Sequence, residues 1–188
     1  MKIVIAPDSF KESLTALEVA EAIETGFKKV FPQAEYVKLP MADGGEGTVQ
    51  SLVDATGGKL VACDVIAPLG NRVKSFFGLS GDGKTAIIEM AAASGLHLVP
   101  KDERNPLNTT SYGTGELIKC ALALGVQHII LGIGGSATND GGVGMLQALG
   151  IRFLNKQHQD IGYGGAQLAE IERIDTGALD NRLAQVHI

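Results

Sequence analysis

Two glycine-rich segments that carry acidic residues are the strongest candidates for chemistry in this sequence. In the first, Met41–Thr48, glycines leave little bulk around the carboxylates of Asp43 and Glu46. Apolar residues predict a strand before the segment and a helix after it. Ligands bind at the carboxyl ends of strands in open α/β sheets, which favours a binding site here. The alternative is a turn whose acidic residues complement the dipole of the helix.

The second segment, Gly132–Gly142, offers the hydroxyls of Ser136 and Thr138 and the carboxylate of Asp140 between a predicted strand and helix. Loop and helix N-terminal N–H groups of this kind bind anions, so we predict an anionic ligand with a metal or a hydroxyl nucleophile. The segment also fits the dinucleotide fingerprint, which makes nicotinamide binding the second interpretation. The acidic residue expected after the next strand is absent, however, because that strand runs into an asparagine and a lysine.

A third segment, Gly78–Thr85, matches the P-loop pattern at every specified position. A P-loop needs a buried strand before it and a helix after it, so that N–H groups converge on phosphate. Here the preceding residues include Arg72 and Lys74, and the following residues have the character of a return strand. We therefore predict a β-hairpin turn rather than a nucleotide site.

Strand and helix signals alternate along the chain, which predicts an α/β fold. The helix that begins after Thr15 is the most secure, because Thr15 and Glu18 match a capping box. We expect strands at residues 3–6, 36–39, 59–66, 72–79, 84–88, 128–131, 151–154 and from 183 onward, and helices at residues 15–30, 46–55, 116–124 and up to 149.

The composition argues against several classes of function. The 188 residues correspond to one large domain, or to one domain and part of another. A net charge of −5 with scattered positive residues argues against a nucleic-acid partner, and no apolar run is long enough to cross a membrane. Cys63 and Cys120 lie far apart in apolar surroundings, so we expect two buried thiols, no disulfide and a cytoplasmic location.

Four motifs, in this order, resemble those of the bacterial type I glycerate kinases: APDSFK at 6–11, ADGGEGT at 42–48, NTTSYGTGE at 108–116 and GGSATNDGG at 134–142. The resemblance implies a Rossmann-like parallel-sheet domain interrupted by a second α/β domain, with the active site between them. The sequence itself predicts the boundary, because a hairpin pattern begins after residues 68–71: residues 1–69 are expected in the first domain and 70–188 in the second, inserted and incomplete domain. Family chains continue well past Ile188, so we expect an N-terminal portion.

The same resemblance implies ATP-dependent, Mg²⁺-dependent phosphorylation of D-glycerate, with the 2-hydroxyl favoured over the 3-hydroxyl as acceptor. A homo-oligomer is left open. A nicotinamide-dependent oxidoreductase and a non-catalytic nucleotide-binding or anion-binding module are the alternatives.

The resemblance also distributes roles over the motifs. Alternatives remain for three residues: Lys11 as a solvated surface residue, Asp140 as a plain N-cap, and Ser111 as a helix cap. The expected catalytic residues are Asp43, Asp140 and Lys11; the substrate-binding residues are Asp8, Ser9, Lys11, Glu46, Asn108 and Ser111; the phosphate-binding residues are Gly134, Gly135, Ser136, Thr138 and Asn139; the metal ligands are Asp43 and Asp140.

Overall fold

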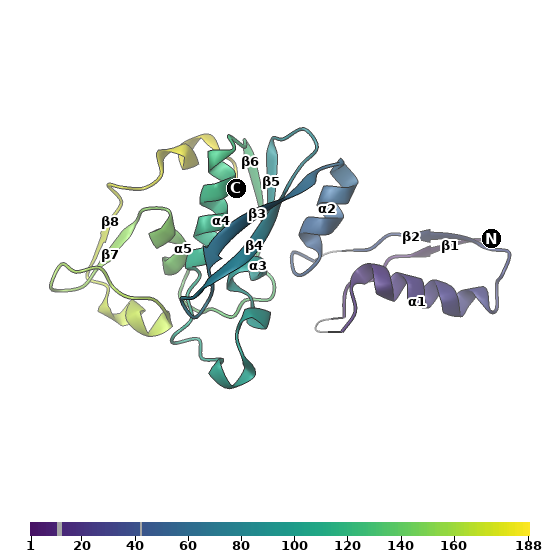
Figure 1. Cartoon of the computed structure of the whole chain (residues 1–188), viewed down its shortest axis with the longest axis horizontal. Helices are drawn as coiled ribbons and strands as arrows, with labels where there is room; N and C mark the ends of the chain where they lie inside the picture. Colours follow the sequence, from purple (N-terminus) through teal and green to yellow (C-terminus); the bar gives the residue numbers. More distant parts are fainter. Residues whose placement is uncertain (11–12, 42) are drawn as a thin grey trace.

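The computed structural model describes residues 1–10, 13–41 and 43–188, so Lys11 lies outside the described residues. Figure 1 shows the arrangement of the elements. The strands are β1 Lys2–Ile5, β2 Glu35–Lys38, β3 Lys59–Ile66, β4 Arg72–Leu79, β5 Thr85–Glu89, β6 His128–Gly132, β7 Arg152–Leu154 and β8 Arg173–Asp175. The helices are α1 Ala16–Lys28, α2 Thr48–Thr56, α3 Ala91–Ser94, α4 Tyr112–Ala123 and α5 Val143–Ala148, with short 3₁₀ helices at 96–98, 101–103, 165–170 and 181–185.

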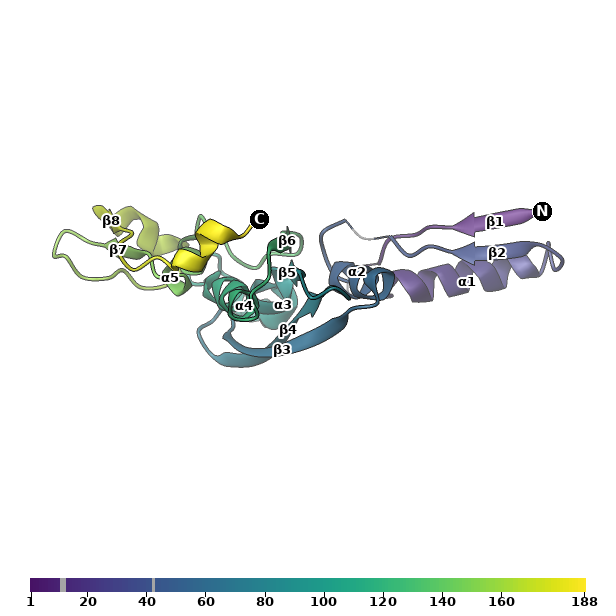
Figure 2. The ribbon, with the colours of Figure 1, turned by 90° about the horizontal axis from the view of Figure 1, so that it is seen from above.

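The N-terminal unit is a parallel β–α–β arrangement of β1, α1 and β2. The predicted capping box is confirmed: the Thr15 hydroxyl accepts from the Glu18 N–H, and the Glu18 carboxylate accepts from the Thr15 N–H. Figures 1 and 2 show this unit at one end of the molecule, apart from the larger sheet. Several of its apolar side chains face solvent, including Val30 at 70% exposure and Val4 at 53%.

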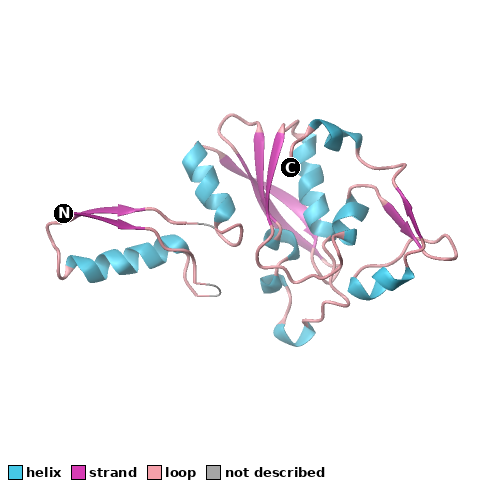
Figure 3. Cartoon of the chain, turned by 180° about the vertical axis from the view of Figure 1, so that it is seen from behind, coloured by secondary structure: helices cyan, strands magenta, loops and turns pink. Residues whose placement is uncertain are grey.

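The larger unit is built on a four-stranded sheet in the order β3-β4-β5-β6. The β3–β4 and β4–β5 pairs are antiparallel, and β5 pairs parallel to β6 after the crossover through α4. Figure 3 shows the strands of this sheet with helices on either side. The predicted α/β class is therefore confirmed, in a mixed sheet that contains a parallel pair.

The core lies on both faces of this sheet because side chains along β5 alternate between them. Ala86 and Ile88 pack with Leu117 of α4, whereas Ile87 packs with Val49 of α2. All five side chains are buried. Helices α2 and α4 thus cover opposite faces, and the carboxyl ends of β5 and β6 open toward the loops that carry the candidate residues.

The segment that matches the P-loop pattern forms the turn between β4 and β5. Asp82 Oδ1 accepts from Ser80 Oγ at 2.6 Å and from Lys84 N at 3.0 Å, and Gly83 takes a positive φ of 70°. The hairpin prediction is confirmed, since a strand rather than a helix follows the glycines.

The domain division at residues 69 and 70 stays a prediction. In the structure these residues form the turn of the β3–β4 hairpin, where Ala67 N donates to Asn71 O at 2.7 Å. Strand β3, expected in the first domain, therefore shares a sheet with β4 and β5 of the second.

The strand expected from residue 183 onward is wrong. Residues 181–185 form a 3₁₀ helix whose start is capped by Asp180, which accepts from Arg182 N at 3.1 Å. Only His187 forms an isolated β-bridge, to His128. The apolar residues 183–188 resemble a strand in sequence, but the acidic cap before them begins a helical turn instead.

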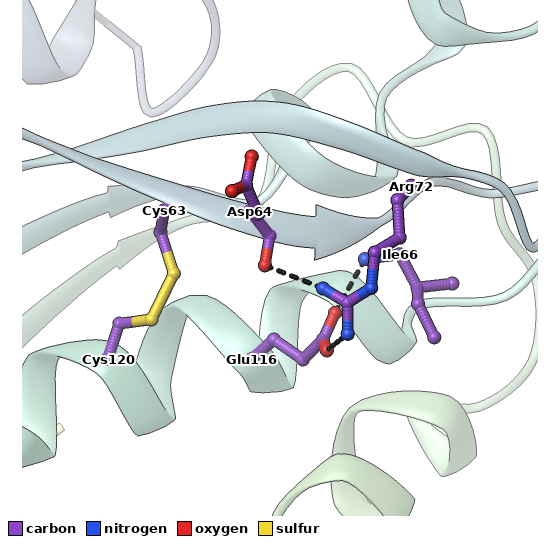
Figure 4. The surroundings of a disulfide bond; sticks show 6 residues. All are labelled: Cys63, Asp64, Ile66, Arg72, Glu116 and Cys120. Carbon is purple, nitrogen blue, oxygen red and sulfur yellow. Dashed lines mark hydrogen bonds and ion pairs between the residues drawn. A yellow bond between two sulfur atoms is a disulfide. The ribbon is translucent and has the colours of Figure 1, made fainter.

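The expectation of two free thiols is also wrong. Cys63 of β3 and Cys120 of α4 are joined by a disulfide across 57 residues (Figure 4). Beside it, Glu116 of α4 accepts from Ile66 N at 2.5 Å and lies 3.4 Å from Arg72. The sequence separation gave no sign of the pairing because the packing of α4 on β3 brings the two cysteines together. Disulfides persist in oxidising environments, so the cytoplasmic prediction loses the support it drew from reduced thiols. No helix among the described residues is long and apolar enough to span a membrane.

Candidate functional site

The two acidic glycine loops, nearly ninety residues apart in sequence, are in contact. Gly134 N donates to Gly44 O at 3.2 Å. A Cβ on Gly132 would lie 2.3 Å from Gly44 O, and a Cβ on Gly134 would lie 2.8 Å from Gly45 Cα. Only glycine allows the two backbones to approach this closely. The loops therefore form one surface beside the carboxyl ends of β5 and β6.

This contact gives some of the glycines a role that the sequence did not indicate. Glycines were expected because a backbone without side chains can approach phosphate, but Gly132 and Gly134 are required by the opposite loop. Gly135 is exposed and has a φ of 76°, a conformation that L side chains rarely adopt. Its N–H remains a predicted phosphate donor, whereas the N–H of Gly134, also predicted to bind phosphate, is already donated to Gly44 O.

In the first loop, Asp43 and Glu46 are both exposed. Asp43 Oδ1 accepts from Gly45 N at 2.8 Å, and Thr48 Oγ1 accepts from Gly44 N at 3.2 Å. These two local hydrogen bonds fix the backbone, while the carboxylates face solvent. The loop can thus present negative charge and hydrogen-bond acceptors to a ligand.

Glu89, at the end of β5, anchors this loop and was missed by the sequence analysis. It is only 6% exposed, and its Oε1 accepts from Val49 N at 2.7 Å. Helix α2 begins after Gly47, which has no side chain to cap it, so Glu89 supplies the cap from forty residues away. The available signal was a single acidic residue ending an otherwise apolar strand.

Burial raises the pKa of Glu89 above its ordinary value, because desolvation penalises the carboxylate. Backbone N–H groups of Val49, Gly47 and Thr48 oppose this rise, and the nearby Glu46 carboxylate adds to it. A buried carboxyl group therefore sits directly beneath the exposed acidic loop.

The carboxylate of Asp140 is 3% exposed and fully engaged. It accepts from Ser111 N at 2.8 Å, from Ser111 Oγ at 2.9 Å, from Gly142 N at 3.0 Å and from Gly144 N at 3.2 Å. These donors fill the roughly four acceptor sites of a carboxylate. The capping interpretation of Asp140 is favoured, and its roles as base and metal ligand stay predictions.

Ser111 joins α4 to α5. Besides donating to Asp140, its Oγ accepts from Met145 N at 3.0 Å. The neighbouring Thr109 hydroxyl donates to Ala137 O at 2.7 Å. The third motif is thus connected to the second loop, which the sequence predicted only through the family resemblance.

Ser136 and Thr138 lie on the open side of the second loop. Their hydroxyl oxygens are 3.0 Å apart, and Ser136 Oγ also accepts from Thr138 N at 3.0 Å. They border a cavity of about 230 Å³ that Arg104 also lines. The guanidinium of Arg104 donates to Val99 O and to Leu96 O, both at 3.3 Å. Sequence analysis did not single out Arg104, since no motif includes it.

The remaining predicted residues are less closely connected. Asp8 is exposed and accepts from Ser9 N at 2.7 Å, and Asn108 and Asn139 are also exposed. Among the described residues, no hydrogen bond joins Asp8, Ser9 or Asn108 to either acidic loop. Their substrate-binding roles, like that of Lys11, stay predictions.

A magnesium ion fits one of the two expected ligands better than the other. Mg²⁺ in phosphoryl-transfer sites is usually held by one or two carboxylates together with substrate phosphates. Asp43 presents an exposed carboxylate of this kind, whereas Asp140 would have to release its hydrogen bonds. In the described part of the chain, no group of three or more His, Cys, Asp or Glu could hold a metal unaided.

Comparison with known proteins supports the family resemblance that the four motifs indicated. The model of the glycerate kinase family matches residues 3–188. A glycerate kinase of Haemophilus influenzae is 79% identical over all 188 residues, and the glycerate 2-kinase of Escherichia coli K12 is 60% identical over 183 residues. The alignments cover 100% and 97% of this chain, but 50% and 48% of those relatives.

A crystal structure assigned to glycerate kinase 2 of Salmonella typhimurium LT2 superimposes with a TM-score of 0.82 at 62% identity. The match covers 100% of this chain and 50% of the Salmonella chain. The chain thus spans about half the length of the relatives it matches. With a family match over residues 3–188 and this identity along its whole length, the chain belongs to the glycerate kinase family.

Proposed function

We propose that the protein phosphorylates D-glycerate at its 2-hydroxyl, with ATP as the donor and Mg²⁺ as the cofactor. The observation that carries this proposal is the contact between the two acidic glycine loops, with Gly134 N donating to Gly44 O. One loop offers exposed carboxylates and the other offers hydroxyls and backbone N–H groups. Phosphoryl transfer to a hydroxyl needs this combination side by side, because positioning and charge neutralisation supply most of the catalysis.

The residues divide between the two substrates. Asp43 is the carboxylate that would hold Mg²⁺, and Glu46 accepts a hydrogen bond from a glycerate hydroxyl. Ser136, Thr138 and the N–H of Gly135 donate to the phosphates. When bound, Mg²⁺ would neutralise phosphate charge as the transferred group leaves ADP.

We assign Asp140 a positioning role within this site. Its hydrogen bonds to Ser111, Gly142 and Gly144 fix the start of α5 and the N-terminus of α4 against each other. The second loop ends at this junction, so Asp140 sets where Ser136 and Thr138 lie. The sequence prediction of a direct chemical role is replaced here by one that acts through the loop.

The choice of the 2-hydroxyl as the acceptor is based on the name of one relative. The Escherichia coli relative, 60% identical, is named glycerate 2-kinase. We extend that regiochemistry to this chain because Asp43, Glu46 and the glycines around them belong to the aligned region. The cytoplasmic location and the homo-oligomer remain predictions.

Phosphorus NMR of the purified protein with ATP, Mg²⁺ and D-glycerate tests the proposal. We expect the resonance of 2-phosphoglycerate to grow as ATP is consumed. Growth of 3-phosphoglycerate instead would reject the regiochemistry alone, and no transfer at all would reject the kinase. Thermal shift then addresses the dehydrogenase alternative, since only a bound nucleotide stabilises the folded state: ATP should raise the melting temperature and NAD⁺ should not.

A further inference from the structure

Glu89, at the end of β5, contacts the elements that carry both acidic loops, and the proposed function gives it no part. Its backbone pairs with Gly132, the first residue of the second loop, in the parallel register of β5 and β6. The next residue, Met90, donates from its N–H to Gly132 O at 2.9 Å. The Glu89 side chain reaches the helix that follows the first loop, because its Oε1 accepts from Val49 N at 2.7 Å.

The hydrogen bonds continue from the start of α2 to the second loop. Thr48 Oγ1, one residue before Val49, accepts from Gly44 N at 3.2 Å. Gly44 O in turn accepts from Gly134 N, two residues after Gly132. The contacts therefore form a closed ring that runs through β5, α2, the first loop, the second loop and β6. Connected hydrogen bonds of this kind make the groups that they join more rigid.

The Glu89 carboxylate is the side chain that closes this ring at α2. Gly47, which precedes the helix, has a φ of 92° and no side chain that could cap it. The carboxylate is only 6% exposed, so water competes little for its hydrogen bonds. Burial raises its pKa, and the N–H groups of Val49, Gly47 and Thr48 oppose the rise. Without Glu89, the first turn of α2 would lose this acceptor and the ring would open.

The body of α2 is held by other contacts. Val49 and Val53 pack with Ile87 of β5, and these three side chains are at most 5% exposed. A Cβ on Gly78 would lie 2.5 Å from Val53 Cγ2, so the helix also packs closely on β4. A variant without the Glu89 carboxylate should therefore fold with α2 in place. The loop before the helix should be less firmly positioned.

Glu46 is the functional group that such a change would reach first. It directly precedes Gly47, and its carboxylate is exposed. It also lies close enough to Glu89 for its charge to add to the raised pKa of that residue. In the proposed function Glu46 accepts a hydrogen bond from a glycerate hydroxyl, so its place affects where that hydroxyl lies. A displacement of about 1 Å in a positioning group can lower the rate about 100-fold.

We propose that Glu89 is a positioning residue for glycerate, which acts by holding Glu46 and the first loop in register with the second loop. This inference rests on the proposed function, in that glycerate is the acceptor. It adds a determinant of the reaction that lies outside all four motifs. The second loop has its own support, because Asp140 accepts from Gly142 N and Gly144 N at the start of α5. Loss of Glu89 should therefore affect the use of glycerate more than that of ATP.

Steady-state kinetics with D-glycerate and ATP varied in turn test this role. In Glu89→Ala, kcat/KM for D-glycerate should fall at least about tenfold, whereas the ATP KM should stay within about twofold of wild type. Glu89→Gln retains an acceptor for Val49 N and should keep kcat/KM within about threefold of wild type. A general loss of stability would not produce this split between the two substrates or the rescue by glutamine.

Asp180→Ala is the matched control for lost stability. The Asp180 side chain is 10% exposed, and it also accepts from a backbone N–H at the start of a helical segment, that of Arg182 at 3.1 Å. Both alanine variants should lower the melting temperature by about 3 °C. Only Glu89→Ala should change the kinetics with glycerate.

A double-mutant cycle with Glu46→Gln tests whether Glu89 acts through Glu46. Adding Glu89→Ala to Glu46→Gln should lower kcat/KM for D-glycerate by no more than about threefold beyond Glu46→Gln alone. If circular dichroism shows that Glu89→Ala does not fold, Glu89→Asp replaces it. The shorter carboxylate cannot reach Val49 N in the same way, so the same loss of kcat/KM is expected.

Three results overturn the role: normal glycerate kinetics in Glu89→Ala, an equal loss in Asp180→Ala, or a full tenfold effect of Glu89→Ala in the Glu46→Gln background. The NMR assay distinguishes these from failure of the proposed function. A wild-type protein that transfers no phosphoryl group rejects the kinase and this role with it. An active wild-type protein whose glycerate kinetics do not depend on Glu89 rejects the positioning role alone.

Discussion

The two acidic loops look alike in sequence and differ in structure. Both place an aspartate among glycines between a strand and a helix. Among the described residues, Asp43 is exposed and accepts one hydrogen bond from its own loop, whereas Asp140 is buried under four donors from two segments. The comparison teaches that an aspartate in a glycine loop can serve a ligand or serve the fold, and that the number of its internal donors distinguishes the two.

The largest expected effect is on folding, at Asp140. In Asp140→Asn, one carboxylate oxygen becomes an amide that faces N–H donors, so at least one hydrogen bond is lost and a repulsive contact replaces it. We expect the free energy of unfolding to fall by about 3 kcal/mol, measured by urea denaturation. Unchanged stability would mean that Asp140 is free to act on a ligand, and the distinction between the loops would disappear.

Asp43→Asn should show the opposite behaviour. The substitution retains the acceptor for Gly45 N but removes the charge that would hold Mg²⁺. We expect stability within about 0.5 kcal/mol of wild type and a fall in kcat of about 100-fold, partly restored by raised Mg²⁺. Normal turnover of this variant would remove Asp43 from the proposed site.

The next prediction concerns the disulfide, which supports the second loop through α4. Cys63 and Cys120 hold β3 to α4, the helix that begins beside Ser111. The double variant Cys63→Ser, Cys120→Ser should lose about 2 kcal/mol of stability, because the unfolded chain regains the freedom of the closed loop. Thiol counting on the wild-type protein is the control. Two free thiols in a fully stable, untreated protein would contradict this prediction.

Glu89 should make the stability of the protein depend on pH, and we expect this effect to be smaller. Its pKa is raised in the folded state, so the folded protein binds the proton more tightly than the unfolded chain does. Its contribution to stability is therefore present below the ordinary value of 4.5 and is lost as pH rises through the raised pKa. Wild type and Glu89→Gln should be denatured at several pH values across this window. As the pH rises, the free energy of unfolding of wild type should fall relative to that of Glu89→Gln by no more than about 1.4 kcal/mol per pH unit.

A matched variant separates the charge of Glu89 from its hydrogen bond. Glu89→Gln keeps an acceptor for Val49 N, while Glu89→Ala removes it and should cost about 1 kcal/mol as a lost helix cap. If both variants show the same pH dependence as wild type, another group titrates in this window.

Sequence patterns were sufficient for several elements whose determinants are local. The capping box at Thr15, the bounds of β3 and β4, and the turn at Gly83 all depend on residues within a few positions of each other. The family motifs identified both acidic loops. Local patterns could not show that the loops touch, since Gly44 and Gly134 are 90 residues apart and meet only in the folded structure.

Three of the misses share one physical cause, which is a partner distant in sequence, whereas the strand expected from residue 183 fails because of the local cap at Asp180. Cys63 finds Cys120, Val49 finds the Glu89 carboxylate, and Asp140 finds Ser111 only after the sheet and α4 have packed. Asp140 is the instructive case: its residue type and spacing are compatible with a ligand or a cap, and only the count of its donors favours the cap.

The smallest expected effect concerns the third glycine loop, which matches a phosphate-binding pattern better than either acidic loop. Lys84 lies in the turn between β4 and β5, and its backbone N–H donates to Asp82. In a true P-loop the corresponding lysine contacts phosphate, and its loss would raise the ATP KM at least tenfold. We expect Lys84→Ala to leave the ATP KM within about twofold of wild type and stability within about 0.5 kcal/mol, since a surface side chain without a buried partner contributes little. Steady-state kinetics at varied ATP measures this, with Asp43→Asn assayed in parallel to establish that a loss would be detected. A tenfold rise in KM for Lys84→Ala would move the phosphates from the second acidic loop to the hairpin and would undo the assignment of Ser136 and Thr138.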